Sequence, residues 1–422
     1  MRLAPLGRGP SLSARRLNEG RGFALEDIRV LELTNFMAGP FCGMLLADMG
    51  ADVIKVENPK GGDFTRGAGP FMDGHAAGFM AVNRNKRSIA LDLKSARGRE
   101  IFLELVRTAD VVVENLRPGT LDDLGIGYAT LNEMNPGIIL SSTTGFGQTG
   151  PYKDRAALDL IVQGMSGLMS ITGEEGRPPV KVGVPLADLS AALFATYAIL
   201  GALRVRDRDG RGQHIDVSLL ESAIALEAWE TSSYFATGEV PKPLGSAHRI
   251  NAPYQAVRTK DGYITIGATT PGNWQSFASS LGLTRLSDDE RFTTGPLRRK
   301  NYRELVTIIE GVTTTQTSEH WYRLLERAGV PCGVLYTLDQ VLDDEHVKAR
   351  GVVREVEHTA LGKVRAIGSP VRPSRTPMRL ERAGPLLGEH TRELLAELGV
   401  TDADALERDG VTASMGQRDR SG

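Results

Sequence analysis

Between residues 29 and 144 the chain alternates short β-branched or aliphatic runs with helical patterns. The runs are RVLELT, ADVIKVE, SIALDL, DVVVEN and IILSSTT. The helical patterns between them are AGPFCGMLLADMG, ARGREIFLELVRTA, which Ser95 can cap, and TLDDLGIGYATLNEMN. Strands separated by helices form βαβ units, and their right-handed crossovers build a doubly wound parallel sheet. The sequence therefore predicts an α/β fold with a Rossmann-like large domain and ligands at the carboxyl ends of its strands.

A chain of 422 residues exceeds one comfortable hydrophobic core, so two domains are expected. The net charge of −2 gives no argument for a nucleic-acid partner. Two cysteines, Cys42 and Cys332, can build neither a disulfide framework nor a four-ligand metal site, so we predict no metal. No apolar run approaches about 18 residues, so we also predict no membrane span.

Residues 1–22 differ from the rest because five arginines stand there against one acid, Glu19. An arginine-rich, acid-poor leader is typical of a mitochondrial transit peptide, although Pro5 and Pro10 weaken a helix there. The alternatives are a disordered extension or a start codon placed too early. In each case we expect this segment to lie outside the fold. The protein is expected in the cytoplasm, or in the mitochondrial matrix if the leader is a transit peptide.

One acid lies in an apolar segment that follows the glycine-rich stretch SSTTGFGQTGPY. Residues 155–173 read RAALDLIVQGMSGLMSITG, and their apolar residues recur at the three- and four-residue steps of a helix with one buried face. Asp159 falls in the first turn of this helix, where the helix dipole favours an anion. A capping role and a functional role both fit this position.

Five motifs favour the functional role of Asp159 over the capping role, because they resemble those of a known family. They are FMAGPFCGMLLADMGADVIKVE, NRNKRSIALDLK, VENLRPGTLDDLG, TTGFGQTGPY and PLLGEHT, in that order along the chain. The chain resembles the family III CoA-transferases, the formyl-CoA:oxalate and carnitine CoA-transferase family, from about residue 28 to about residue 399. The resemblance implies that Asp159 attacks an acyl-CoA thioester. It implies a mixed anhydride and then an aspartyl-CoA thioester as intermediates, with CoA thioesters as substrates and no permanently bound cofactor.

The resemblance also implies which residues contact CoA. These are Met37, Ala38, Leu91, Asp92, Leu93, Lys94, Asn115, Leu116, Arg117, Thr144, Gly145, Phe146 and Gly147. Lys94 and Arg117 are expected to face phosphates, and the peptide groups of residues 144–147 to hold the pantetheine arm or the acyl oxygen. Each of these residues also has a local structural explanation in a turn or a surface loop. The chain departs from the oxalate enzymes at Met37, Asn58 and Asp123, which puts an oxalate-like acceptor and some phosphate contacts in doubt.

A second region begins near residue 225, where Lys260-Asp261-Gly262 signals a hairpin turn. Helical patterns follow at residues 298–311 and 318–328. This region most resembles the members that use dicarboxylates, which implies that Ala247, His248 and Arg249 lie near the acyl pocket. Arg249 could pair with the distal carboxylate of a succinyl group, or it could form a surface salt bridge. Succinyl-CoA as donor and a C4 to C6 dicarboxylate as acceptor are therefore expected.

The expected domain plan has four parts after the leader. Residues 23–217 form the large domain, 225–335 the smaller α+β domain, 343–400 a segment that rejoins the large domain, and 401–422 a flexible tail. The resemblance implies an interlocked homodimer. Asp188, at the opening of another long apolar helix, is interpreted as a structural helix-start residue.

Two other functions remain open from the residues. An acyl-CoA racemase of the same fold would abstract an α-proton, but its relevant members have a histidine directly before the matching aspartate, where this chain has Leu158. A non-catalytic CoA-binding protein is the other alternative, and an intact Asp159 argues against it.

Overall fold

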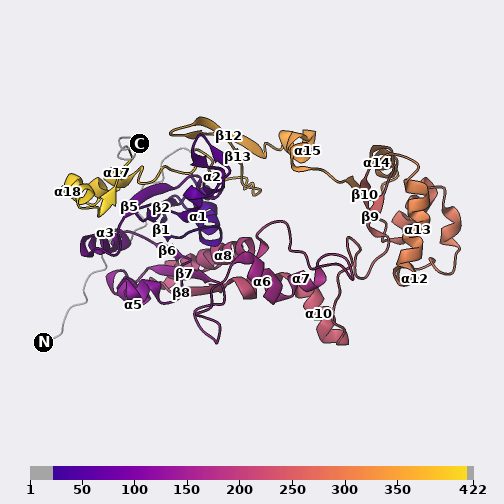
Figure 1. The fold of residues 1–422 in the computed structure, drawn as a ribbon, viewed down its shortest axis with the longest axis horizontal. Helices are drawn as coiled ribbons and strands as arrows, with labels where there is room; N and C mark the ends of the chain where they lie inside the picture. Colours follow the sequence, from indigo (N-terminus) through magenta and orange to yellow (C-terminus); the bar gives the residue numbers. More distant parts are fainter. Residues whose placement is uncertain (1–21, 416–422) are drawn as a thin grey trace. The chain divides into compact units, whose positions relative to one another are not determined.

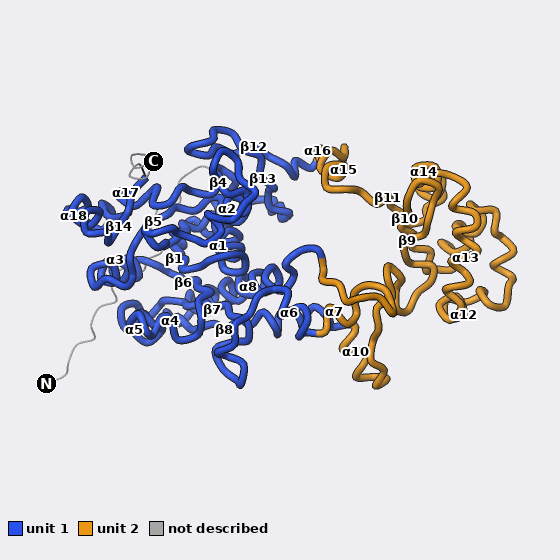
Figure 2. The backbone as a smooth tube through the Cα atoms, viewed as in Figure 1, with its two compact units in different colours: residues 1–166, 183–228, 350–422 blue, residues 167–182, 229–349 orange. Residues whose placement is uncertain are grey.

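The computed structural model describes residues 22–415. Within it the chain divides into two compact units (Figure 2), and it passes between them four times. Unit 1 comprises residues 1–166, 183–228 and 350–422, and unit 2 comprises residues 167–182 and 229–349. The division differs from the expected one because residues 167–182 and 343–349 belong with the second unit and residues 225–228 with the first. The predicted leader lies outside the described residues, apart from Gly22.

A seven-stranded sheet forms the centre of unit 1 (Figure 1), with the strand order β14-β5-β2-β1-β6-β7-β8. Its strands are β1 (Arg29–Leu33), β2 (Asp52–Glu57), β5 (Arg87–Leu91), β6 (Val111–Glu114), β7 (Ile139–Thr144), β8 (His214–Ser218) and β14 (Thr412–Ala413). All neighbours pair in parallel except β14, which runs antiparallel to β5. The predicted α/β class with a largely parallel central sheet is confirmed, and all five predicted strands are present.

Helices and short hairpins surround this sheet in unit 1. They are α1 (Ala38–Asp48), α2 (Ala77–Asn83), α3 (Ala96–Arg107), α4 (Thr120–Asp123), α5 (Tyr128–Met134), α6 (Asp159–Ser166), α8 (Leu186–Asp209), α9 (Leu219–Leu226), α17 (Thr391–Glu397), α18 (Ala403–Arg408), the 3-10 helix η2 (Phe64–Gly67), and the strands β3 (Phe71–Met72), β4 (His75–Ala76), β12 (Val353–His358) and β13 (Gly362–Ile367). Ser95 caps α3 as predicted, because its hydroxyl accepts the Gly98 N–H at 2.9 Å. Phe102 and Leu105 of α3 pack with the strand residues Ile89 and Val112 in the core.

The structure corrects four sequence predictions. The single helix expected over residues 155–173 is two helices, since Gly167 adopts a φ of 110° between α6 and α7. Its apolar face is largely exposed in the single chain, with Leu158 67% accessible, because periodicity reports apolar character but not whether a partner covers it. The tail predicted to be loose contains α18 and β14 up to residue 415. The pattern predicted as one helix over residues 120–135 is α4 and α5, separated at Gly125, whose φ is 73°.

Helix α8 is long and apolar enough to cross a membrane, with a mean hydropathy of 1.7 in its most apolar window. The prediction that no apolar stretch reaches this length is therefore wrong. Half of that window is buried inside the structure. The helix lies beside α1, where Thr196 donates to the Cys42 sulfur at 3.4 Å (Figure 1). Because a buried core helix meets the same length and composition criteria, this feature is weak evidence for a membrane span.

Unit 2 contains a three-stranded antiparallel sheet in the order β11-β10-β9, with helices around it. Its elements are β9 (Tyr254–Arg258), β10 (Tyr263–Gly267), β11 (Cys332–Val334), α7 (Leu168–Ile171), most of α10 (Ala228–Thr237), α11 (Pro271–Ser280), η3 (Thr284–Ser287), α12 (Gly295–Lys300), α13 (Tyr302–Thr313), α14 (Ser318–Arg327), α15 (Leu338–Asp343) and α16 (Glu345–Ala349). Strands β9 and β10 form the predicted hairpin. Val257, Ile264, Phe277 and Trp321 contribute to a separate core.

Candidate functional site

The residues predicted to contact CoA follow four strands of one parallel sheet, so they lie at its carboxyl edge. The strand order reverses direction between β1 and β6, and ligands bind at such a switch point in open α/β sheets. The two loops at this point are joined by the Asn115 side chain, which accepts the Asn35 N–H and donates to the Asn35 carbonyl, both at 2.8 Å. The structure therefore brings Met37 and Ala38 together with Asn115 and Arg117.

Residues 91–94, at the end of β5, were also predicted to contact CoA, but their bonds are mostly local. The side chain of Leu91 is buried in the core and does not reach the edge. Asp92 accepts the Lys94 N–H at 3.0 Å, and the Lys94 carbonyl accepts a bond from Arg99 at 2.9 Å, so this segment forms a local turn into α3. Lys94 exposes its side chain to solvent.

The glycine-rich loop after β7 is tightly bonded to its own surroundings. The Gly147 N–H donates to the Thr144 hydroxyl at 3.0 Å. This N–H was expected to be open to the pantetheine arm or the acyl oxygen, but it already has a partner within the loop. Gly147 has a φ of 87°, a conformation that glycine adopts without strain. A Cβ on Gly145 would lie 2.1 Å from the Ala157 Cβ, so only glycine lets the loop approach the segment that leads to Asp159.

Asp159 lies in the first turn of α6, as predicted, and its two carboxylate oxygens have different partners. Oδ1 accepts the Ala187 N–H from the start of α8 at 2.9 Å, and Oδ2 accepts Nε2 of Gln163 at 2.7 Å. The N-termini of α6 and α8 therefore meet at this carboxylate. Gln163 was not among the predicted residues, although the four-residue spacing on one helix face was a usable signal.

Asp188 is the second carboxyl group in this region. Burial, with a smaller contribution from the Asp159 charge, raises the pKa of Asp188 to about 7. The predicted helix-start role does not account for this, because a helix N-terminus alone would lower the pKa of a carboxyl group. A negative charge on Asp159 therefore opposes a second negative charge on Asp188.

We expect Asp188→Asn to stabilise the protein at high pH and not at low pH. The folded protein holds the Asp188 proton up to about pH 7 and the unfolded chain releases it near the ordinary value of 3.8, so the wild type loses stability as pH rises between these values. The variant lacks this loss. The advantage of the variant in unfolding free energy should therefore grow by about 2 kcal/mol between about pH 5 and about pH 8. This value is smaller than the pKa difference alone would give, because Asp188 is partly exposed and solvent screens its charge. Denaturant titrations at both pH values measure it, and an advantage that does not change with pH would contradict the assignment.

The three residues predicted to lie near the acyl pocket, Ala247, His248 and Arg249, are in unit 2. His248 stacks on Tyr254 at 5.0 Å, and its Nδ1 accepts the N–H groups of Ile250 and Asn251, both at 3.1 Å. The Arg249 guanidinium donates to the Lys242 carbonyl at 3.2 and 3.3 Å. Within residues 22–415 no ion pair includes Arg249, so the surface salt bridge considered from the sequence is not found there.

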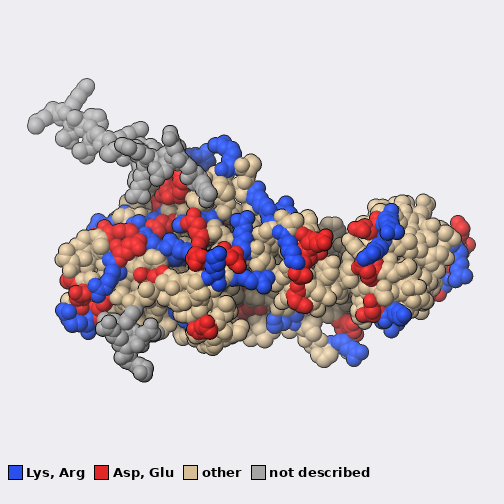
Figure 3. All heavy atoms as spheres, turned by 90° about the horizontal axis from the view of Figure 1, so that it is seen from above, with Lys and Arg blue, Asp and Glu red and all other residues tan. Residues whose placement is uncertain are grey.

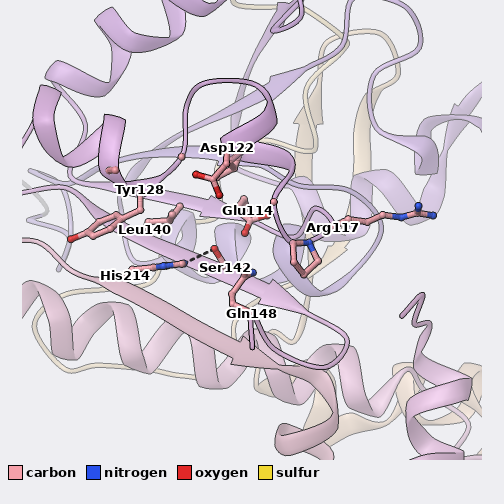
Figure 4. A pocket seen from close by; sticks show the side chains of 13 residues that line it. Glu114, Arg117, Asp122, Tyr128, Leu140, Ser142, Gln148 and His214 are labelled. Atoms are coloured by element: carbon pink, nitrogen blue, oxygen red, sulfur yellow. Dashed lines mark hydrogen bonds between the residues drawn. The ribbon is translucent and has the colours of Figure 1, made fainter. Parts of the chain in front are cut away.

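A small cavity of about 140 Å³ lies beside β6, β7 and β8 (Figure 4). Burial raises the pKa of Glu114 to about 7, although the carboxylate accepts the Leu116 N–H at 2.7 Å. Ser142 and His214 are hydrogen-bonded at 2.9 Å, whereas the Arg117 guanidinium extends away from this group. This cavity was not predicted from the sequence, where the only signal was an acid, Glu114, at the end of an apolar strand.

Acidic and basic side chains are interspersed on the face drawn in Figure 3, so this face carries no large patch of one sign. In the described part of the chain, no group of three or more His, Cys, Asp or Glu residues is placed to hold a metal ion.

A family model described as CoA-transferase family III matches residues 25–391. This chain belongs to CoA-transferase family III. The predicted family and enzyme class, a CoA-transferase, are thus confirmed. A family III relative from Mus musculus, "Succinyl-CoA:glutarate CoA-transferase", is 43% identical over 91% of this chain and 88% of its own length. Another, "Succinate--glutarate CoA-transferase" from Agrobacterium fabrum, is 42% identical over 90% of this chain and 97% of its own.

A solved structure agrees with the fold. The crystal structure of a CAIB/BAIF family protein from Brucella suis superposes with a TM-score of 0.81 and is 40% identical. The superposition covers 89% of this chain and 99% of that one.

Proposed function

We propose that this family III enzyme transfers CoA from succinyl-CoA to a C4 to C6 dicarboxylate, with Asp159 as the nucleophile. The names of the two relatives, which specify succinyl-CoA or succinate and glutarate, support the substrates. The observation that carries the nucleophile is the bond from the Ala187 N–H to Asp159 Oδ1, which holds a partly exposed carboxylate at the start of two helices. The CoA ester would lie along the carboxyl edge, at residues 37–38, 115–117 and 144–147.

The reaction then proceeds by four acyl exchanges at one carboxyl group. Asp159 attacks the succinyl carbonyl, the carbon–sulfur bond breaks, and CoA thiolate leaves a mixed anhydride. The thiolate attacks the Asp159 carbonyl and expels succinate, which gives an aspartyl-CoA thioester. The acceptor carboxylate attacks this thioester and releases thiolate again, and the thiolate takes the new acyl group from the second anhydride. Asp159 is restored, and no proton is gained or lost overall.

Each step at the Asp159 carbonyl places negative charge on one of its oxygens. The Ala187 N–H is directed at Oδ1 and can stabilise that oxyanion when Oδ2 carries the acyl group or has been displaced. Gln163 Nε2, which donates to Oδ2 in the resting site, orients the carboxylate for attack. In this proposal the start of α8 supplies the stabilisation that the sequence analysis had placed in the glycine-rich loop.

An acceptor panel tests the substrate class, and Arg249 provides the matched variant. We expect transfer from succinyl-CoA to C4 to C6 dicarboxylates and weak transfer to monocarboxylates of equal length, read by mass spectrometry of the acyl-CoA products. Arg249→Met should raise KM for the dicarboxylate by about tenfold, because a charged hydrogen bond to its distal carboxylate is lost. Arg303→Met, which removes an exposed arginine paired with Glu175 in the same unit, should have no effect. Equal use of both acid classes by the wild type would contradict the proposal.

We also propose that the enzyme is a homodimer of interlocked subunits. Support comes from large apolar side chains that the single chain leaves exposed on α6, α8 and α10, among them Leu160, Leu193, Tyr197, Trp229 and Phe235. A second subunit would cover such residues. Sedimentation equilibrium at micromolar concentration should give twice the chain mass of 45.6 kDa, and a monomer at that concentration would count against the proposal.

A further inference from the structure

Phe36, directly after the Asn35 backbone that Asn115 holds, combines three unusual properties. Its φ is 63°, in the left-handed region that residues other than glycine seldom adopt. Its ring is 53% exposed to solvent. It stacks on Phe64, which is 71% exposed, with ring centroids 5.5 Å apart and planes within 12°. Two large aromatic rings in water add little to stability, so this arrangement needs another explanation.

The backbone around Phe36 is held by a buried set of polar and charged groups. The Phe36 N–H donates to Asp63 Oδ1 at 3.3 Å, and the Phe64 N–H donates to the Asn35 side chain at 3.4 Å. Asp63 in turn pairs with the fully buried Lys55 at 3.0 Å. The protein therefore fixes a strained conformation while leaving the rings uncovered. Strain kept in this way is characteristic of functional sites.

The position of the stacked pair indicates which ligand could cover it. Phe36 lies between the end of β1 and the start of α1, at the switch point of the sheet. Helices α1 and α8 lie side by side (Figure 1). Helix α1 leads from β1 to the parallel strand β2, and α8 leads to β8, which is parallel to β7, so the N-termini of both helices lie at the carboxyl edge. The start of α8 holds Asp159. Phe36 is therefore at the same end of the sheet as the proposed nucleophile.

The chemistry of the pair favours an uncharged, flexible partner over a phosphate. Lys55 and Arg66, two cations of this scaffold, are already paired with Asp63 and Glu57. Two flat, exposed rings offer apolar contact area and no charge. We propose that Phe36 and Phe64 form an aromatic platform for the pantetheine arm next to the thioester. This inference rests on the proposed function, because it takes the acyl-CoA ester as the ligand of this edge.

Kinetics with a complete and a truncated donor test the platform. Phe36→Gly and Phe64→Ala should each raise KM about tenfold, both for succinyl-CoA and for succinyl-pantetheine, which lacks the nucleotide. The kcat value should change little. Phe36→Gly should keep the melting temperature, since glycine adopts the φ of 63° without strain. Phe71→Ala, which removes an equally exposed phenylalanine of the same unit, serves as the control and should change neither constant.

Two results would overturn the platform. A rise in KM confined to succinyl-CoA would place the rings at the nucleotide, and unchanged KM values in both variants would show that the ester does not touch them. Titration calorimetry with CoA alone separates this inference from the proposed function. If the wild type binds CoA without transferring it, the proposed function fails. The platform is judged separately: weaker binding of CoA and pantetheine by both variants supports it, and unchanged binding refutes it.

Discussion

Asp159→Ala abolishes CoA transfer, with an expected fall in kcat of at least about 10⁴-fold. Alanine offers no oxygen to the thioester, so neither the anhydride nor the aspartyl-CoA thioester can form. The fold should persist, because Asp159 is partly exposed and its loss removes a charge that opposes ionisation of Asp188. Steady-state transfer from succinyl-CoA measures the activity, and the melting temperature measures the fold.

Asp159→Asn is the sharper variant of the same experiment. Its side chain has nearly the same shape, and its amide oxygen can still accept the Ala187 N–H, but it lacks the anionic nucleophile. A fall in activity as large as that of Asp159→Ala, with unchanged CoA binding, separates nucleophilic attack from positioning. Transfer by either variant at a tenth or more of the wild-type rate would remove Asp159 from the mechanism.

Lys55→Met should give the largest loss of stability, about 3–5 kcal/mol in unfolding free energy. The Lys55 ammonium is fully buried and contacts Glu32 at 2.9 Å, Asp63 at 3.0 Å and the Thr34 carbonyl at 2.9 Å. Methionine fills a similar volume but leaves buried carboxylates without their cation. Lys86 offsets part of the loss through its own pair with Glu32 at 2.7 Å.

Lys363→Met is the matched control for this measurement. Lys363 pairs with Glu355 at 3.6 Å, and both side chains are about two-thirds exposed. Exposed pairs contribute about 1 kcal/mol or less, so urea denaturation should show almost no change. Equal effects of the two substitutions would mean that the buried network does not stabilise the loop after β1.

Strands within βαβ units could be predicted because each buried strand has its own apolar run. Strand β8 was missed because His214 and Asp216 are exposed, so HIDVS shows no continuous apolar pattern. Strand β14 has two residues and pairs with Leu91 and Ala90, far away in the sequence. Local patterns carry no information about such a partner.

Contacts between residues far apart in the sequence also limited the prediction of the candidate site. The position of Asp159 follows from the motifs and the helical period, but the Ala187 N–H that holds it comes from 28 residues later in the chain. The buried network could not be inferred either. Glu32 and Lys55 each stand between apolar residues of their strands, and only the register that places them opposite each other reveals the pair.

The most direct test of the account is to trap the enzyme during turnover. Hydroxylamine added to the enzyme with succinyl-CoA should convert an acylated carboxyl group to a hydroxamate, and peptide mass spectrometry locates it. If Asp159 is the nucleophile, its modification depends on succinyl-CoA and is absent from Asp159→Asn. Modification at another residue, or no modification while transfer proceeds, would contradict this role.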